Sequence, residues 1–141
     1  MNQLTPFIAS FLVLAIGGLI NASYLTVKHY QKKPLVCPIN HDCSTVTESK
    51  WSHIFYIRNE FLGILFFLSI LASILITIFS TSTIFISTIS YFTPILTGIG
   101  LLFSSFLLLI QAFAIKKYCF YCILSAIITL LLFLNSLALY R

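Results

Sequence analysis

Long apolar runs interrupted by short polar stretches make up most of the chain. Between Phe61 and Ile115 there is no Lys, Arg, Asp or Glu. A single helix over these 55 residues would be roughly 80 Å long, at about 1.5 Å per residue. Because that is about twice the thickness of a bilayer, the stretch must turn back once. The pattern predicts two membrane-spanning helices in this region.

The whole chain contains four such segments, and each approaches the ~20 residues that a bilayer requires. They cover about 6–27, 61–79, 93–115 and 119–140. The sequence therefore predicts an all-α fold, an integral membrane four-helix bundle that forms one domain over residues 1–141. We expect the first span to remain as an uncleaved anchor, because MNQLT before it has no basic residue and its apolar run is too long for a signal peptide.

Polar segments connect the predicted spans. We expect the Ser- and Thr-rich stretch 80–90 to form the turn between the second and third spans, with Pro94 in the first turn of the third helix. The long connection, residues 28–60, contains most of the polar side chains. In it, Thr45 and Glu48 have the Thr-x-x-Glu spacing of a capping box, which predicts a short helix over about 45–52.

Composition excludes a soluble globular protein. Hydrophobic residues make up 60% of the chain and charged residues 8%, and the mean hydropathy is +1.06. The net charge of +5 is small and lies near the predicted membrane surface, where basic side chains serve as interface anchors. We therefore expect the lipid bilayer, and not nucleic acid, as a partner.

The membrane spans also decide which polar segments share a face. Two crossings separate the 28–60 connection from the turn at Lys116 and Lys117, so both segments lie on one side of the membrane. Seven of the eight basic residues lie on that side, which by the positive-inside rule favours the cytoplasm. Stable disulfide chemistry favours the opposite side, because the cytosol keeps thiols reduced. Composition alone leaves the orientation open.

The four cysteines form two close pairs on this shared face. Cys119 and Cys122 form a C-x-x-C motif at the start of the fourth span, where the helix N-terminus and the neighbouring lysines favour a thiolate. Cys37 and Cys43 lie in the long connection, close enough in sequence to form a disulfide readily. Because disulfides are passed on by thiolate attack, two adjacent pairs are consistent with a relay of thiol–disulfide exchange.

Two other interpretations of the cysteines remain. They could form purely structural disulfides, or, together with His41, a thiolate-rich metal site like that of a small mercury or copper carrier. His29 and His53 are better interpreted as interfacial residues than as metal ligands.

The order and spacing of several motifs resemble the vitamin K epoxide reductase family, in its small bacterial or archaeal form. The resemblance covers nearly the whole chain. Its motifs are Ser23-Tyr24-Leu25-Thr26, Cys37 and Cys43-Ser44-Thr45-Val46 with Ser49-Lys50-Trp51, Asn59 to Gly63, and Tyr118 to Cys122 with Ser125.

The resemblance implies a quinone-linked thiol oxidoreductase with a four-helix core around the quinone. By analogy, Cys37 and Cys43 would be the shuttle pair of the loop, Cys43 would exchange with Cys119, and Cys122 would act on the quinone. Ser49, Asn59 and Gly63 would belong to the quinone site. The alternative interpretations are a solvated helix serine for Ser49 and a helix N-cap for Asn59.

Further expectations follow from the same resemblance. Many bacterial relatives carry a fused thioredoxin-like domain, whereas this sequence ends at Arg141, so we expect a separate thioredoxin-like protein as redox partner. The electron acceptor would be a membrane quinone, ubiquinone or menaquinone, with reduction of vitamin K epoxide as an alternative. The expected location is the cell membrane, with the cysteine face on the extracytoplasmic side.

Overall fold

The apolar segments form helices of membrane-spanning length. A computed structural model describes residues 4–38, 43–54 and 56–140. Within these ranges, four helices are long and apolar enough to cross a membrane. They are α1 (Leu4–Tyr30), α3 (Asn59–Phe79), α4 (Thr83–Ile110), which continues as the π-helical turn η2 (Gln111–Ile115), and α5 (Phe120–Tyr140). The predicted all-α membrane bundle is confirmed.

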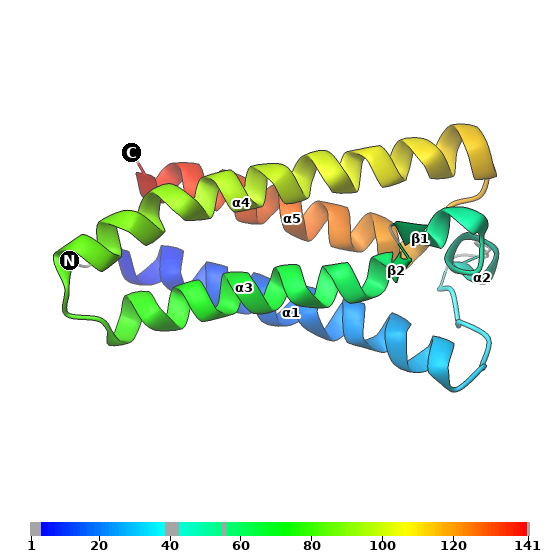
Figure 1. Cartoon of the computed structure of the whole chain (residues 1–141), viewed down its shortest axis with the longest axis horizontal. Helices are drawn as coiled ribbons and strands as arrows, with labels where there is room; N and C mark the ends of the chain where they lie inside the picture. The colour runs from blue at the N-terminus through cyan, green and yellow to red at the C-terminus, as the bar shows by residue number, and fades with distance from the viewer. Residues whose placement is uncertain (1–3, 39–42, 55, 141) are drawn as a thin grey trace.

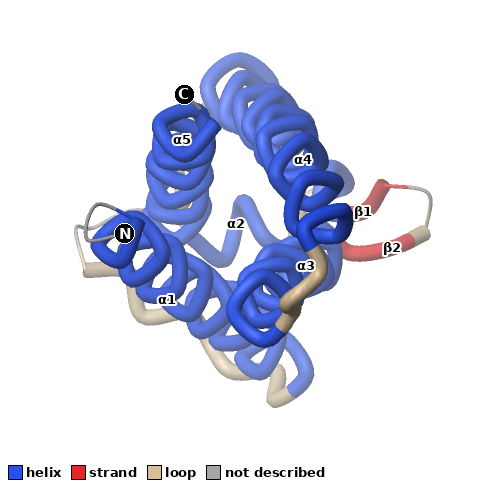
Figure 2. Tube along the Cα trace, turned by 90° about the vertical axis from the view of Figure 1, so that its left-hand side faces the viewer, coloured by secondary structure: helices blue, strands red, loops and turns tan. Residues whose placement is uncertain are grey.

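The four long helices run antiparallel to their neighbours in sequence (Figure 1). Viewed along the bundle, they stand in the order α1, α3, α4, α5 around a ring, and the short helix α2 (Cys43–Thr47) lies across the far end (Figure 2). α1 packs on α3 and α5, and α4 packs on α5. The cysteine-bearing loop and the start of α5 therefore meet at the same end of the bundle.

The core of the bundle is apolar and closely packed. Phe67 and Ile70 of α3 and Leu132 of α5 are buried, together with Ala15 of α1. Gly18 of α1 lies directly against the ring of Phe67, where a Cβ atom would overlap the ring. The absence of a side chain at position 18 therefore allows α1 and α3 to approach each other closely.

The connection between α3 and α4 is much shorter than predicted. The prediction of a turn over 80–90 was wrong, because α4 already begins at Thr83. Within this stretch the Thr88 hydroxyl donates to the carbonyl oxygen of Ile84 at 3.0 Å, so this polar group is satisfied inside the helix. Pro94 consequently lies inside α4 and not in its first turn. Pro94 has no N–H to donate to the carbonyl oxygen of Ser90, a loss that membrane helices tolerate where neighbouring groups satisfy the freed carbonyl.

The loop also folds differently from the prediction of one helix over 45–52. It forms α2, a 3₁₀ turn η1 (Lys50–Ser52), and a small hairpin of β1 (His53–Ile54) and β2 (Ile57–Arg58). The two strands are antiparallel, with His53 opposite Arg58 and Ile54 opposite Ile57. The predicted capping box is absent because Thr45 lies inside α2, and the Glu48 carboxylate pairs with His29 and Arg58.

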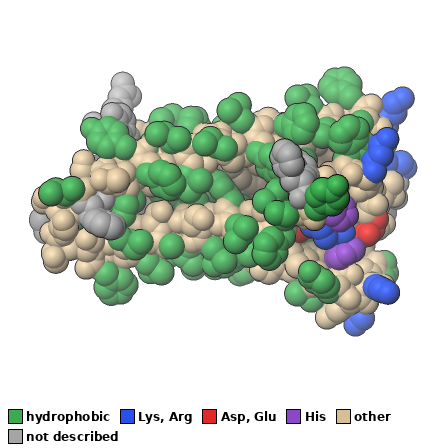
Figure 3. Space-filling view, in the orientation of Figure 1, with side chains coloured by type: hydrophobic (Ala, Val, Ile, Leu, Met, Phe, Trp, Pro, Cys, Tyr) green, Lys and Arg blue, Asp and Glu red, His purple; other side chains and the backbone are tan. Residues whose placement is uncertain are grey.

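Charged side chains gather at the end of the bundle that carries the loop (Figure 3). The long side of the molecule in this view is covered by hydrophobic and uncharged side chains. Since apolar side chains face lipid and charged ones face water, this distribution places the loop at a membrane surface.

We predict that Gly18→Ala destabilises the bundle, because the new methyl group overlaps a Phe67 ring that is only 2% exposed and has little room to move. Overpacking of this kind costs about 1–3 kcal/mol. Gly17→Ala is the matched control: a Cβ at position 17 meets nothing within 4 Å. Thermal unfolding in detergent should show a lower midpoint for Gly18→Ala only; equal midpoints for the two variants would contradict the close packing of α1 and α3.

Candidate functional site

All four cysteines meet at the loop end of the bundle. Cys37 and Cys43 form a disulfide, with their Cα atoms 6.1 Å apart, and Cys119 and Cys122 are free thiols. Cys43 and Cys119 are 1% and 0% exposed and lie in one buried cluster with Val46, against which Cys37 and Cys122 pack. This confirms the prediction that both pairs share one face.

Cys119 lies immediately before α5, where free backbone N–H groups of a helix start are available. A hydrogen bond from the Cys122 thiol lowers the pKa of Cys119 below the usual range, and the N–H groups of Cys122 and Tyr121 add to this effect. Burial of Cys119 acts in the opposite direction but does not outweigh the hydrogen bonds. The site therefore favours a thiolate at Cys119, mainly through its partner cysteine.

Gln111 fixes the start of α5 and was missed by the sequence analysis. Its side-chain Oε1 accepts a hydrogen bond from the N–H of Cys119 at 3.1 Å, and the residue is only 3% exposed. It begins the π-helical turn η2, a feature that often occurs at functional sites. A signal was present in the sequence, because Gln111 is the only amide side chain between Phe61 and Ile115, and polar residues within membrane spans are commonly functional.

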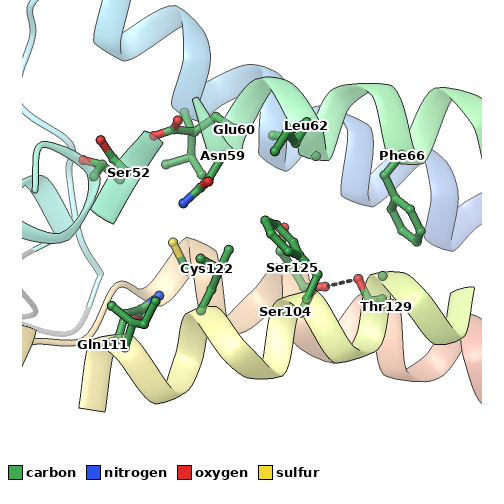
Figure 4. A pocket seen from close by; sticks show the side chains of 18 of the residues that line it. Ser52, Asn59, Glu60, Leu62, Phe66, Ser104, Gln111, Cys122, Ser125 and Thr129 are labelled. Atoms are coloured by element: carbon green, nitrogen blue, oxygen red, sulfur yellow. Dashed lines mark hydrogen bonds between the residues drawn. The ribbon is translucent and has the colours of Figure 1, made fainter. Parts of the chain in front are cut away.

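An apolar cavity of about 340 Å³ adjoins the cysteine cluster. α1, α3, α4, α5 and the loop all contribute to its walls. Cys122, Asn59, Glu60 and Gln111 lie at one end of the cavity, with the Cys122 thiol directed toward Asn59, and Phe66 and Thr129 lie farther along (Figure 4). A mainly apolar cavity with polar groups at one end suits a ring system that carries a few polar atoms.

Three further residues predicted for the site also line this cavity. Asn59 donates from Nδ2 to the carbonyl oxygen of Trp51 at 3.0 Å, and its buried Oδ1 has no hydrogen-bond partner. It is the first residue of α3, not its N-cap, which is Arg58. Ser49 lines the wall with its hydroxyl donating to the carbonyl oxygen of Val46. Gly63 faces α1, where a Cβ would come within 3.5 Å of Ala22.

Ion pairs attach the cysteine-bearing helix α2 to the bundle. Arg58 donates from Nε and Nη2 to the two carboxylate oxygens of the buried Glu60, and from Nη2 to the carbonyl oxygen of Thr47 at the end of α2. Glu48, next along the chain, lies 2.7 Å from His29 at the end of α1. These contacts hold α2, and with it Cys43, over the start of α5.

The structure gives only part of the alternative metal site, which would consist of the four cysteines and His41. Cys37 and Cys43 are bonded to each other, and His41 lies outside the described residues. In the ranges that the structure describes, His, Cys, Asp and Glu side chains form no group of three or more suited to a metal ion. His29 pairs with Glu48, and His53 lies 2.9 Å from the hydroxyl of Ser52.

A membrane bundle that places a disulfide and a dithiol together beside an apolar cavity has the architecture of a membrane-bound thiol–disulfide oxidoreductase. The family model described as vitamin K epoxide reductase family matches residues 9–137, and the chain belongs to this family. The comparison with curated proteins finds no match. Family membership supports an oxidoreductase that handles thiols and disulfides in a membrane, and members of this family generally use quinones.

We predict that the Cys119 pKa depends on a hydrogen-bond donor at position 122. In a chain that also carries Cys37→Ala and Cys43→Ala, Cys122→Ala and Cys122→Ser each leave Cys119 as the only thiol. The serine hydroxyl can still donate to the Cys119 thiolate, whereas alanine cannot. The ultraviolet absorbance of the thiolate should therefore appear at a lower pH in Cys122→Ser than in Cys122→Ala. Coincident titration curves would contradict the hydrogen bond as the main cause.

Proposed function

We propose that this protein oxidises a separate thioredoxin-like protein through Cys37 and Cys43 and passes the electrons through Cys119 and Cys122 to a membrane quinone, ubiquinone or menaquinone. It would thereby support disulfide formation in other proteins. The observation that carries the proposal is the order of the four sulfurs. Cys37 is partly exposed, Cys43 and Cys119 are buried together, and Cys122 lines the apolar cavity.

The first step of the proposed cycle takes place at the partly exposed Cys37. A thiolate of the partner attacks the Cys37 sulfur, forms a mixed disulfide and releases Cys43 as a thiolate. The second thiolate of the partner then attacks the partner's first sulfur in the mixed disulfide and releases Cys37. The partner leaves as a disulfide, and Cys37 and Cys43 are left as a dithiol that carries two electrons more than before.

The second step moves these electrons between the two pairs. When Cys119 and Cys122 are joined, the Cys43 thiolate attacks the Cys119 sulfur and releases the Cys122 thiolate. Cys37 then attacks Cys43, restores the loop disulfide and releases the Cys119 thiolate. The result is the redox state of this structure, with an oxidised loop pair and a reduced C-x-x-C pair.

The third step restores the disulfide of the C-x-x-C pair. Cys119 and Cys122 close to a disulfide as two electrons and two protons pass to the quinone bound beside Cys122, which leaves as a quinol. The cavity fits such a substrate by volume and by its apolar walls. The buried Oδ1 of Asn59 has no donor within the described residues, and a hydroxyl of the quinol product can donate to it, whereas a quinone carbonyl cannot.

We predict that Cys122→Ala abolishes quinone reduction and accumulates a Cys43–Cys119 crosslink. Cys119 can still attack Cys43 in the loop disulfide and release Cys37. Without Cys122, the only thiol of the chain that can open the Cys43–Cys119 bond is Cys37, whose attack reverses the step. Quinol formation with dithiothreitol as reductant and peptide mapping of the disulfides measure both effects. Cys119→Ala is the control, since it should abolish turnover without any crosslink. Undiminished turnover of Cys122→Ala would refute the relay, and vitamin K epoxide tested in parallel decides between the two substrates.

We propose that the cysteine face is extracytoplasmic, because stable disulfides form in oxidising compartments. The seven basic residues on that face favour the opposite orientation under the positive-inside rule, so a direct test is needed. Two single-cysteine variants of a cysteine-free chain provide it: Lys33→Cys beside the loop pair, and Ser82→Cys in the connection between α3 and α4.

In intact cells, a membrane-impermeant maleimide should label position 33 and reach position 82 only after lysis. Both positions lie outside the long helices and are exposed, so access to the reagent depends on the side of the membrane. The reverse labelling pattern would place the cysteine face in the cytoplasm.

A further inference from the structure

One side chain connects the two cysteine pairs by a hydrogen bond. Tyr121 lies within the Cys119-Phe-Tyr-Cys122 motif, and its hydroxyl donates to the carbonyl oxygen of Val36 at 2.7 Å. Val36 immediately precedes Cys37 in the chain. The first turn of α5 therefore holds the backbone of the loop directly beside the disulfide.

Helix α1 in turn fixes Tyr121. The Nδ2 of the buried Asn21 donates to the Tyr121 carbonyl oxygen at 2.9 Å and to the Ser125 hydroxyl at 3.0 Å. The ring of Tyr24 packs on the ring of Tyr121, with centroids 5.1 Å apart. Because both its backbone and its ring are held, the Tyr121 hydroxyl has a defined position from which to bind the loop.

The loop segment before the disulfide has few other means of attachment to the bundle. Residues 31–34 are exposed, and the Val36 side chain is 68% exposed, so Val36 contributes little burial. Leu35 packs on the cysteine cluster, and the Tyr121 hydrogen bond holds the next residue. When the bond between Cys37 and Cys43 opens during exchange, the disulfide no longer joins Cys37 to α2, whereas the Tyr121 hydrogen bond can persist.

We propose that Tyr121 is a positioning residue that keeps Cys37 and Cys43 aligned with Cys119 during exchange between the two pairs. In this exchange the bond between Cys43 and Cys119 forms as that between Cys119 and Cys122 breaks. Cys37 then displaces Cys119 from Cys43. Two electrons move from the loop pair to the C-x-x-C pair, protons exchange with water, and no further oxidant is needed. This inference rests on the relay proposed above.

A single-turnover experiment without quinone tests the inference. The chain is first oxidised to carry both disulfides, and then receives one equivalent of dithiothreitol in uncharged detergent. Samples are acid-quenched at successive times and alkylated. Peptide mass spectrometry then gives the time course of reduction of each cysteine pair. Tyr121→Phe keeps the aromatic ring and removes only the hydroxyl.

We expect Tyr121→Phe to slow the transfer from the loop pair to Cys119 and Cys122 about fivefold to tenfold, as loss of one hydrogen bond implies. Initial reduction of the loop disulfide should not become slower. Tyr121→p-aminophenylalanine, which restores a donor, should recover the transfer rate. Tyr30→Phe is the control, because it removes an exposed hydroxyl at the same end of the bundle.

A chain that also carries Cys37→Ala and Cys43→Ala separates positioning from a general structural role. There dithiothreitol must reduce the C-x-x-C pair directly, so Tyr121→Phe should have no effect on that rate. Equal slowing with and without the loop pair, or no slowing in either, would overturn the role of Tyr121. If the loop pair of the unmodified sequence never passes electrons to Cys119 and Cys122, the relay itself fails and this inference with it.

Discussion

The lipid interior offers no hydrogen-bond partners to a polypeptide backbone, and the architecture of this protein depends on that constraint. Each apolar segment must satisfy its own N–H and C=O groups, which makes it a helix that crosses the membrane completely. An even number of crossings separates the loop that carries Cys37 and Cys43 from the turn before Cys119. The thiols consequently meet at one end of the bundle, where water and the apolar cavity are both close.

At that end of the bundle, polar contacts orient the loop on the apolar core. The core helices cannot by themselves orient α2, which is only five residues long. Arg58 joins α2 to α3 through Thr47 and Glu60, and His29 joins it to α1 through Glu48. Because Glu60 is buried, removal of Arg58 would leave an unpaired charge, and such a loss is strongly destabilising. These contacts therefore fix α2 relative to α1 and α3.

Two local signals failed, each for a different physical reason. The Thr45 and Glu48 pattern is a sound capping signal, but the Glu48 carboxylate pairs with His29 and Arg58 instead. Serine and threonine after Ser80 suggest a turn in water. In a membrane helix such a hydroxyl can bond to the preceding turn, as that of Thr88 does, and α4 begins earlier than the pattern indicates.

The sequence by itself determined the number of spans, the shared face of the two cysteine pairs and the family. Hydropathy, the number of membrane crossings and motif spacing depend only on the order of residues along the chain. Only the tertiary structure decided that Cys43 and Cys119 are buried together, that Gln111 fixes the start of α5, and that Tyr121 reaches Val36. These contacts join segments that are up to 85 residues apart. They depend on how the helices pack around the cavity, and local sequence pattern carries no information about that packing.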